Sequence, residues 1–170
     1  MELIDIIPEF NLYEEFWRIY TKGDIIPPQY VAEDAVVERS IIGEGTEIYG
    51  EVHNSVIGAG ATIKKGAVVR DSIVMKQTVI GENDIIDKAI IAENVTVGDN
   101  VVMGVGEDIP NKEKPDVYSF GLVTIGENTV IPSNVTIGKN TAIVGQTCAG
   151  DYPGGVLESG ETLNKEGETE

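Results

Sequence analysis

Aliphatic residues recur along much of the chain at an interval that fits neither a helix nor a single strand. In the segment TIGENTVIPSNVTIGKNTAIVG, residues 124–145, an isoleucine begins each unit of six residues: Ile125, Ile131, Ile137 and Ile143. A helix repeats near 3.6 residues and a strand repeats at 2. A strict spacing of six therefore predicts an internal structural repeat.

The same repeat extends upstream, where the steps between aliphatic residues are six or five. These residues are Ile57, Ile63, Val69, Val74, Ile80, Ile86, Ile91 and Val97. Three consecutive steps sum to 17, so each period contains three short sides. One coil alone cannot bury its aliphatic side chains, so we expect coils stacked at the ~4.8 Å spacing of paired strands, with these residues on the axis.

Corner residues follow the aliphatic positions at a fixed distance. Three places later stands Gly or Asn, the residues that most readily tolerate positive φ: Gly45, Gly60, Gly66, Asn83, Asn94, Asn100, Asn128, Asn134 and Asn140. One place further stands a small or β-branched residue, which we expect to face inward: Thr46, Ala61, Ala67, Val95, Val101, Thr129, Val135 and Thr141. This hexapeptide pattern resembles that of the left-handed parallel β-helix. The resemblance, which alone carries the handedness, predicts an all-β fold of that class.

The repeat predicts how the chain is divided. We expect the β-helix over residues 31–147, with a loop insertion at 104–122 that breaks the period and that Tyr118 and Phe120 could pin to the outer wall. Residues 148–170 read as a polar tail, mobile from about Glu158.

The first 30 residues do not follow the repeat, and they are rich in aromatic side chains. Since a solenoid end must be covered, we expect this segment to serve as a cap, as a linker that docks another domain, or as both. The residues expected to dock are Phe10, Tyr13, Phe16, Trp17 and Tyr20.

Composition narrows the classes of partner. Twelve basic and 29 acidic residues give a net charge of −17, which argues against nucleic acid and against anionic membrane surfaces as partners. Cys148 is the single cysteine, so no intrachain disulfide can form. No apolar stretch approaches the ~18 residues of a membrane span. We therefore expect a cytoplasmic protein.

Few residues carry recognisable chemistry, and we predict no catalytic, cofactor-binding or metal-binding residue. There is no phosphate-binding GxxxxGK[ST] loop, no CxxC and no HExxH. The single histidine, His53, follows inward Val52 and so should point outward. Hexapeptide acyltransferases commonly use one such His as general base with an acyl-CoA. A stand-alone acyltransferase using acetyl-CoA and His53 is therefore the alternative function, although a solvent-facing or interface histidine is the simpler explanation of the pattern.

Basic residues suggest one further site. Arg39, Arg70 and Lys88 occupy related places in VERS, VRDS and IDKA, which could stack them on one side of the solenoid. They could contact the anion of a phosphorylated effector. Charge balance among many carboxylates is the simpler explanation.

Three stretches carry a more specific resemblance. The chain resembles the C-terminal region of bacterial glucose-1-phosphate adenylyltransferases in two stretches, NLYEEFWRIYT and PPQYVAEDAVVERSIIGEGTEIYGEVHNSVIGAGATIKKGAVVRDSIVM. It resembles that family's ending in a third, DYPGGVLESGETL. The family makes ADP-glucose from ATP and glucose 1-phosphate with Mg²⁺, for glycogen synthesis. Its catalytic residues lie in an N-terminal domain that has no counterpart here.

The resemblance implies a fragment that is inactive alone. In the family, this region packs on the catalytic domain, builds a homotetramer and helps form the effector site. In plant relatives a Lys in the last coils contributes to effector binding, whereas the corresponding residue here is Glu127, a reversal of charge. The leading hypothesis is thus an oligomerisation and regulatory domain whose partners are the catalytic domain and further copies of itself.

Overall fold

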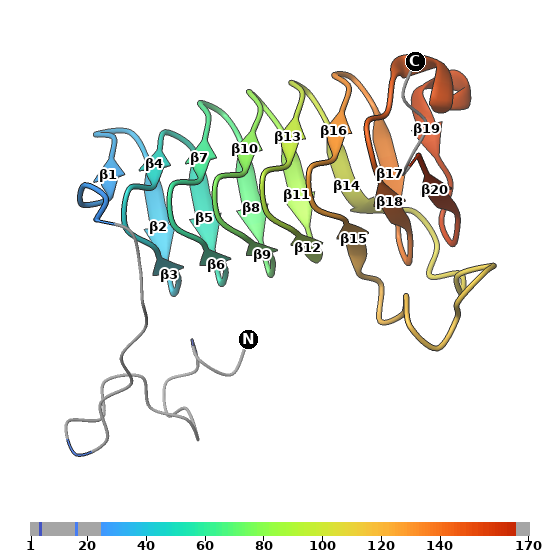
Figure 1. Cartoon of the computed structure of the whole chain (residues 1–170), viewed down its shortest axis with the longest axis horizontal. Coiled ribbons are helices and arrows are strands. Elements are labelled where there is room, and N and C mark those ends of the chain that lie inside the picture. Colours follow the sequence, from blue (N-terminus) through green and yellow to red (C-terminus); the bar gives the residue numbers. More distant parts are fainter. Residues whose placement is uncertain (1–3, 5–15, 17–24, 166–170) are drawn as a thin grey trace.

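The computed structural model describes Ile4, Phe16 and residues 25–165, and it shows three parallel sheets wound into one solenoid (Figure 1). Each coil contributes one short strand to each sheet, so strands three apart in the chain are usually hydrogen-bonded neighbours. The coils follow one another along the longest axis of the molecule. The expected fold class, an all-β left-handed parallel β-helix, is confirmed.

The three sheets, named A, B and C here, account for all strands in the described part of the chain. Sheet A contains β1 (Tyr30–Val31), β4 (Glu47–Ile48), β7 (Thr62–Ile63), β10 (Val79–Ile80), β13 (Thr96–Val97) and β16 (Val130–Ile131). Sheet B contains β2 (Val36–Glu38), β5 (Glu51–His53), β8 (Val68–Arg70), β11 (Ile85–Asp87), β14 (Val102–Val105), β17 (Thr136–Gly138) and β19 (Val156–Leu157). Sheet C contains β3 (Ile41–Ile42), β6 (Val56–Ile57), β9 (Ile73–Val74), β12 (Ala89–Ile91), β15 (Val123–Ile125), β18 (Ala142–Val144) and β20 (Thr162–Asn164).

The periodic aliphatic residues fill the axis, as the spacing predicts. In sheet B, for example, Val52 pairs in register with Val69, and Val69 with Ile86. The inward residues from the second coil to β18 are at most 1% exposed: Ile48, Val52, Ile57, Ile63, Val69, Val74, Ile80, Ile86, Ile91, Val97, Met103, Ile125, Ile131, Ile137 and Ile143. Each contributes roughly 1.5–3 kcal/mol on burial as an upper estimate.

The corner residues adopt the left-handed conformation that their type predicts. All nine Gly and Asn residues named above have positive φ, from 55° at Asn140 to 76° at Gly66. The small residues that follow them are all buried. The sequence pattern missed five further left-handed corners. Gln77 has the recognised position but is neither Gly nor Asn, and the other four stand two rather than three places after the aliphatic residue: Arg39, Asn54, Asp71 and Lys88.

A ladder of serines supports the corner between sheets B and C. The backbone N–H of Ser55 donates to Ser40 Oγ, and that of Ser72 donates to Ser55 Oγ, both at 3.1 Å. The N–H of Ala89 donates to Ser72 Oγ at 3.0 Å, where the ladder ends. Inward hydroxyls therefore satisfy backbone donors at the shortened corners, where the step is five residues.

The insertion at 104–122 is held by two asparagines rather than by aromatic residues. Asn111 Nδ2 donates to the carbonyl of Asn140 at 2.9 Å, and Asn140 Nδ2 donates to that of Ile109 at 2.8 Å. Both asparagines are 2% exposed. Phe120 is instead 86% exposed, so the expectation that it pins the loop is wrong.

The solenoid continues past residue 147, which corrects the expected boundary and the expected mobile tail. β19 pairs with β17, and β20 pairs with β18, each in parallel. Between β18 and β19 lie two short 3₁₀ helices, η2 (Ala149–Asp151) and η3 (Pro153–Gly155). Leu163 follows Leu157 by six residues and Gly160 stands between them with φ 77°, so the repeat persists within a polar sequence.

Candidate functional site

Within the described residues 25–165, the apolar axis is left uncovered at the first coil. Val31 occupies the inward position of β1, in register with Ile48, yet it is 45% exposed while Ile48 is fully buried. Tyr30 and Val36 in the same coil are also exposed, and the rings of Tyr30 and Tyr49 lie 5.7 Å apart. A contact with another part of the protein could therefore bury further apolar surface at this end of the molecule.

The opposite end is closed by the chain itself. Tyr152, between η2 and η3, joins the hydrophobic core at 2% exposure and shares a hydrogen bond of 2.8 Å with Thr147 Oγ1. Burial raises the pKa of Tyr152 to about 12. Asp151 accepts a hydrogen bond from the N–H of Cys148 and forms an ion pair with Lys165 at 3.1 Å, which together lower its pKa. The two ends of the solenoid thus differ in whether their core is covered.

The segment expected to dock another domain lies mostly outside the described residues. Phe10, Tyr13, Trp17 and Tyr20 belong to that part of the chain, and Phe16 is 97% exposed. Ile26, near the start of the described range 25–165, lies beside the corner of Gly45, where its Cδ1 is 3.3 Å from a Cβ built on that glycine. The chain therefore enters beside the open coil.

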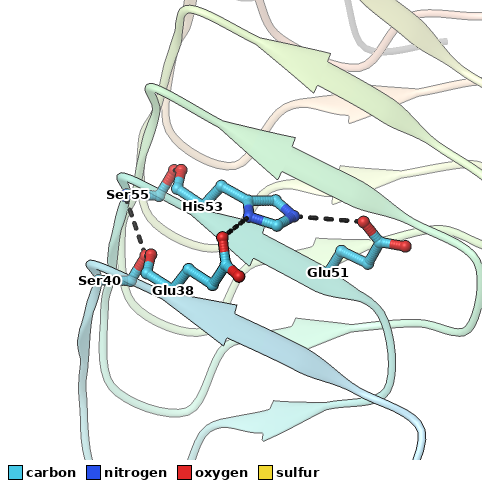
Figure 2. A network of polar contacts seen from close by, with 5 residues as sticks. All are labelled: Glu38, Ser40, Glu51, His53 and Ser55. Atoms are coloured by element: carbon cyan, nitrogen blue, oxygen red, sulfur yellow. Dashed lines mark hydrogen bonds and ion pairs between the residues drawn. The ribbon is translucent and has the colours of Figure 1, made fainter.

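His53 points outward from β5 and lies between two carboxylates (Figure 2). Its Nδ1 lies 3.1 Å from Glu38 Oε2 in the preceding coil, and its Nε2 lies 3.2 Å from Glu51 Oε2 on its own strand. The side chain is 26% exposed. Only the doubly protonated imidazolium can donate from both nitrogens at once.

This geometry does not favour the acyltransferase alternative. A general base needs a ring nitrogen whose lone pair faces the substrate, whereas both nitrogens here face carboxylate oxygens. The carboxylates lie on opposite sides of the ring, so they do not converge on a point that a cation could occupy. Among the described residues, no group of three His, Cys, Asp or Glu side chains suits a metal ion.

The three predicted anion-binding residues do not form one column. Arg70 is in register with His53 and Asp87, on the outer wall of sheet B. Arg39 and Lys88 stand instead at the left-handed corner position, with Asn54 and Asp71 in the coils between them. The structure therefore places a carboxylate or an amide between the cations rather than bringing the cations together.

A buried carboxyl group was not predicted. Asp84 is fully buried in the column of second inward residues, between Ala67 and Val101. Its two oxygens accept the N–H groups of Gly81 and Val101, each at 2.7 Å. Burial raises the pKa of Asp84 to about 7, even though these hydrogen bonds favour the carboxylate. The signal was an Asp directly after corner Asn83, where the repeat requires a small inward residue.

The fold and its surfaces define a class: a hexapeptide β-helix whose described residues contain no catalytic constellation and whose first coil is open. The chain matches the family model "GlmU-like, C-terminal hexapeptide" over residues 27–125 and belongs to that family. It is 69% identical over 168 residues to glucose-1-phosphate adenylyltransferase of Lachnospira eligens, covering 99% of this chain and 40% of the relative. It is 46% identical over 170 residues to the same enzyme of Acetivibrio thermocellus, covering 100% and 40%.

These matches place the chain as the C-terminal region of such proteins, since it spans about 40% of their length. The solved structure of an Arabidopsis UDP-N-acetylglucosamine acyltransferase is 13% identical, with a TM-score of 0.39, over 82% of this chain and 57% of that one. That likeness is too distant to bear on function. In the part of the chain that the structure describes, no helix has the length and apolar character to cross a bilayer.

Proposed function

We propose that this chain is the assembly and regulatory domain of a glucose-1-phosphate adenylyltransferase. In the whole protein, a preceding catalytic domain makes ADP-glucose and pyrophosphate from ATP and glucose 1-phosphate, with Mg²⁺, in the cytoplasm. In this proposal, ATP and Mg²⁺ bind to the preceding catalytic domain. Its contribution is to hold catalytic domains in a fixed arrangement within a homotetramer.

The uncovered first coil is the observation that supports this proposal most directly. Its inward Val31 is 45% exposed at the end where the preceding chain enters, whereas Tyr152 closes the far end. A domain placed before residue 1 would reach this coil first and could bury its apolar residues. Effector binding would then be transmitted through a rigid body, with a coupling of ~1–3 kcal/mol typical of allosteric proteins.

A fusion protein tests the proposal. The catalytic region of the Lachnospira eligens enzyme, joined in frame before Met1, should synthesise ADP-glucose, while the 170-residue chain alone should not. Substituting Val31→Glu in the fusion should lower activity by about tenfold or more, because a charge would be buried in the docking contact. Val130→Glu is the matched control, since Val130 is 38% exposed on the same sheet at the far end.

Two outcomes would contradict the proposal. One is a well-folded fusion that lacks ADP-glucose synthesis. The other is equal activity of the Val31→Glu and Val130→Glu fusions, which would show that the open coil contacts nothing that matters for catalysis.

A further inference from the structure

Within residues 25–165, the first coil is held to the solenoid on one side only. Each coil of a solenoid contacts its neighbours alone, and β1, β2 and β3 have β4, β5 and β6 of the second coil as their neighbours. Figure 2 shows two polar side-chain contacts across this junction: Glu38 contacts the ring of His53, and Ser40 Oγ accepts the backbone N–H of Ser55. The serine contact does not change with pH, whereas the histidine contact can.

Carboxylates dominate the charge of these two coils. Residues 30–57 contain six acidic residues, one arginine and no lysine: Glu33, Asp34, Glu38, Glu44, Glu47, Glu51 and Arg39. His53 is also the single histidine of the chain. Histidine ordinarily changes its charge between about pH 5 and 8. The proton of His53 is therefore the positive charge that these coils can gain or lose near neutral pH.

We propose that the protonation state of His53 controls how firmly the first coil is held to the second coil, and thereby how well the open end binds the preceding domain. The imidazolium can donate to Glu38 Oε2 at 3.1 Å and to Glu51 Oε2 at 3.2 Å at the same time. Neutral imidazole has one N–H, so its second nitrogen presents a lone pair to a carboxylate. Loss of the proton therefore removes the charge attraction and leaves one unfavourable contact.

Three charged groups face this ring from the strands around it: Glu38 from β2, Glu51 from β5 and Arg70 from β8. Arg70 repels the imidazolium, but it is exposed and lies one strand away, at a backbone spacing of ~4.8 Å. The two carboxylate oxygens contact the ring nitrogens directly, and Coulomb energy falls with distance. Attraction is therefore the larger effect, so the first coil should loosen as pH rises and His53 loses its proton.

This loosening would act on the surface that the preceding domain is proposed to cover. β2 carries Val36, which is 38% exposed, and it belongs to the same coil as Val31. The bond between Ser40 and Ser55 persists at every pH, so β2 should loosen locally while the corner after it stays in place. A domain that docks there must order this strand, so docking should weaken. That consequence rests on the proposed function, whereas the effect of the proton on the coil does not.

Amide hydrogen exchange of the 170-residue chain at several pH values between about 5 and 8 tests the proposal. After correction for the intrinsic pH dependence of exchange, the protection factors of the β2 amides should fall by roughly threefold to tenfold as His53 loses its proton, as expected for two partly exposed ion pairs. The NMR signal of the single imidazole ring reports that titration on the same sample. The midpoints of the two curves should coincide.

Variants separate this effect from other titrations. His53→Gln cannot ionise and should abolish the fall. Asp84, whose pKa is about 7, ionises in the same range, so wild type and His53→Gln are compared at each pH, where its contribution cancels. Glu38→Gln should also abolish most of the fall and replaces His53→Gln if that variant does not fold. Glu33→Gln is the matched control, since it removes the same charge from an exposed corner of the same coil and should leave the fall intact.

Identical pH dependence of β2 protection in wild type and His53→Gln would overturn the proposal. So would a difference between them that extends equally to β15 and β18, because the effect would then not belong to the first coil.

The fusion protein tests the consequence for docking. The ratio of wild-type activity to His53→Gln activity should decrease toward one as pH rises through the His53 titration, because docking weakens in the wild-type fusion alone. A ratio that stays constant while β2 protection changes would overturn the link to docking. The exchange experiment uses the isolated chain, so failure of the Val31→Glu test would count against the proposed function and not against the role of His53 in the coil.

Discussion

Individual residues in this fold are constrained by their place in a coil more than by their chemistry. The left-handed corner between sheets B and C holds Arg39, Asn54, Asp71 and Lys88 in successive coils, all with φ between 45° and 49°. Gly and Asn corners could be predicted from the sequence because those residue types signal positive φ. Arginine and lysine give no such signal, and every residue of this column stands two rather than three places after its aliphatic residue, so the column was not recognised from the sequence.

Asp84 makes the stability of the fold depend on pH. Its pKa is about 7 in the folded chain, raised from 3.8, so the folded state retains its proton at a pH where the unfolded state has lost it. Stability contributed by this group is therefore complete below pH 3.8 and is lost as pH rises toward 7. The groups that face it are Asp99, which raises its pKa, and Lys64, which lowers it.

Asp84→Asn removes this dependence. The free energy of unfolding of the variant, relative to the wild-type chain, should increase as pH rises from about 4 to about 8, because the amide cannot ionise. Urea unfolding at several pH values measures the difference. Asp87→Asn, which removes the same charge from the outer wall of sheet B, is the control and should show a much smaller trend. A difference between Asp84→Asn and wild type that stays constant with pH would contradict the assignment.

At the scale of elements, the repeat predicts what lies within one coil but not what joins distant coils. Period and corner residues were enough to assign the axis of sheets A, B and C. The contacts of the insertion, by contrast, connect Asn111 with residues 29 to 51 positions away. No local pattern encodes such pairs. The last coil was missed for another reason: Leu157, Gly160 and Leu163 keep the spacing, but the surrounding sequence is polar enough to resemble a tail.

Asn140 has two roles: its backbone forms a left-handed corner, and its side chain holds the insertion by hydrogen bonds. A substitution can separate these roles. Asn140→Gly keeps the left-handed corner, where φ is 55°, but removes the hydrogen bonds from its side chain to Asp108 and Ile109 and from the Gly121 N–H. We expect a cost of about 1–3 kcal/mol, with amide exchange faster in residues 106–121 and unchanged in the first coils. Asn134→Gly is the control, since Asn134 is a corner residue whose side-chain Oδ1 accepts a hydrogen bond from Asn100 Nδ2 rather than holding the insertion. Equal exchange in the two variants would contradict the anchoring role.

For the whole molecule, the decisive feature is that its two ends are unlike. In a solenoid each coil contacts only its neighbours, so stability is approximately a sum of local terms and the ends fray first. Tyr152 covers the last coils, and nothing in residues 25–165 covers Val31 equally well. The isolated chain should therefore open from its first coil, the end that a preceding domain would protect.

Removing the cover at the far end should make both ends alike. Tyr152→Ala should cost about 3–5 kcal/mol locally, because it empties a buried aromatic site, whereas Tyr152→Phe should cost about 1 kcal/mol for the lost bond to Thr147. Hydrogen exchange should then show lost protection in β17 to β20 while β4 to β8 keep theirs, since coupling between coils passes only through neighbours. A uniform loss of protection from β4 to β20 would show that the coils melt as one cooperative unit, and the difference between the ends could then no longer explain where a partner binds.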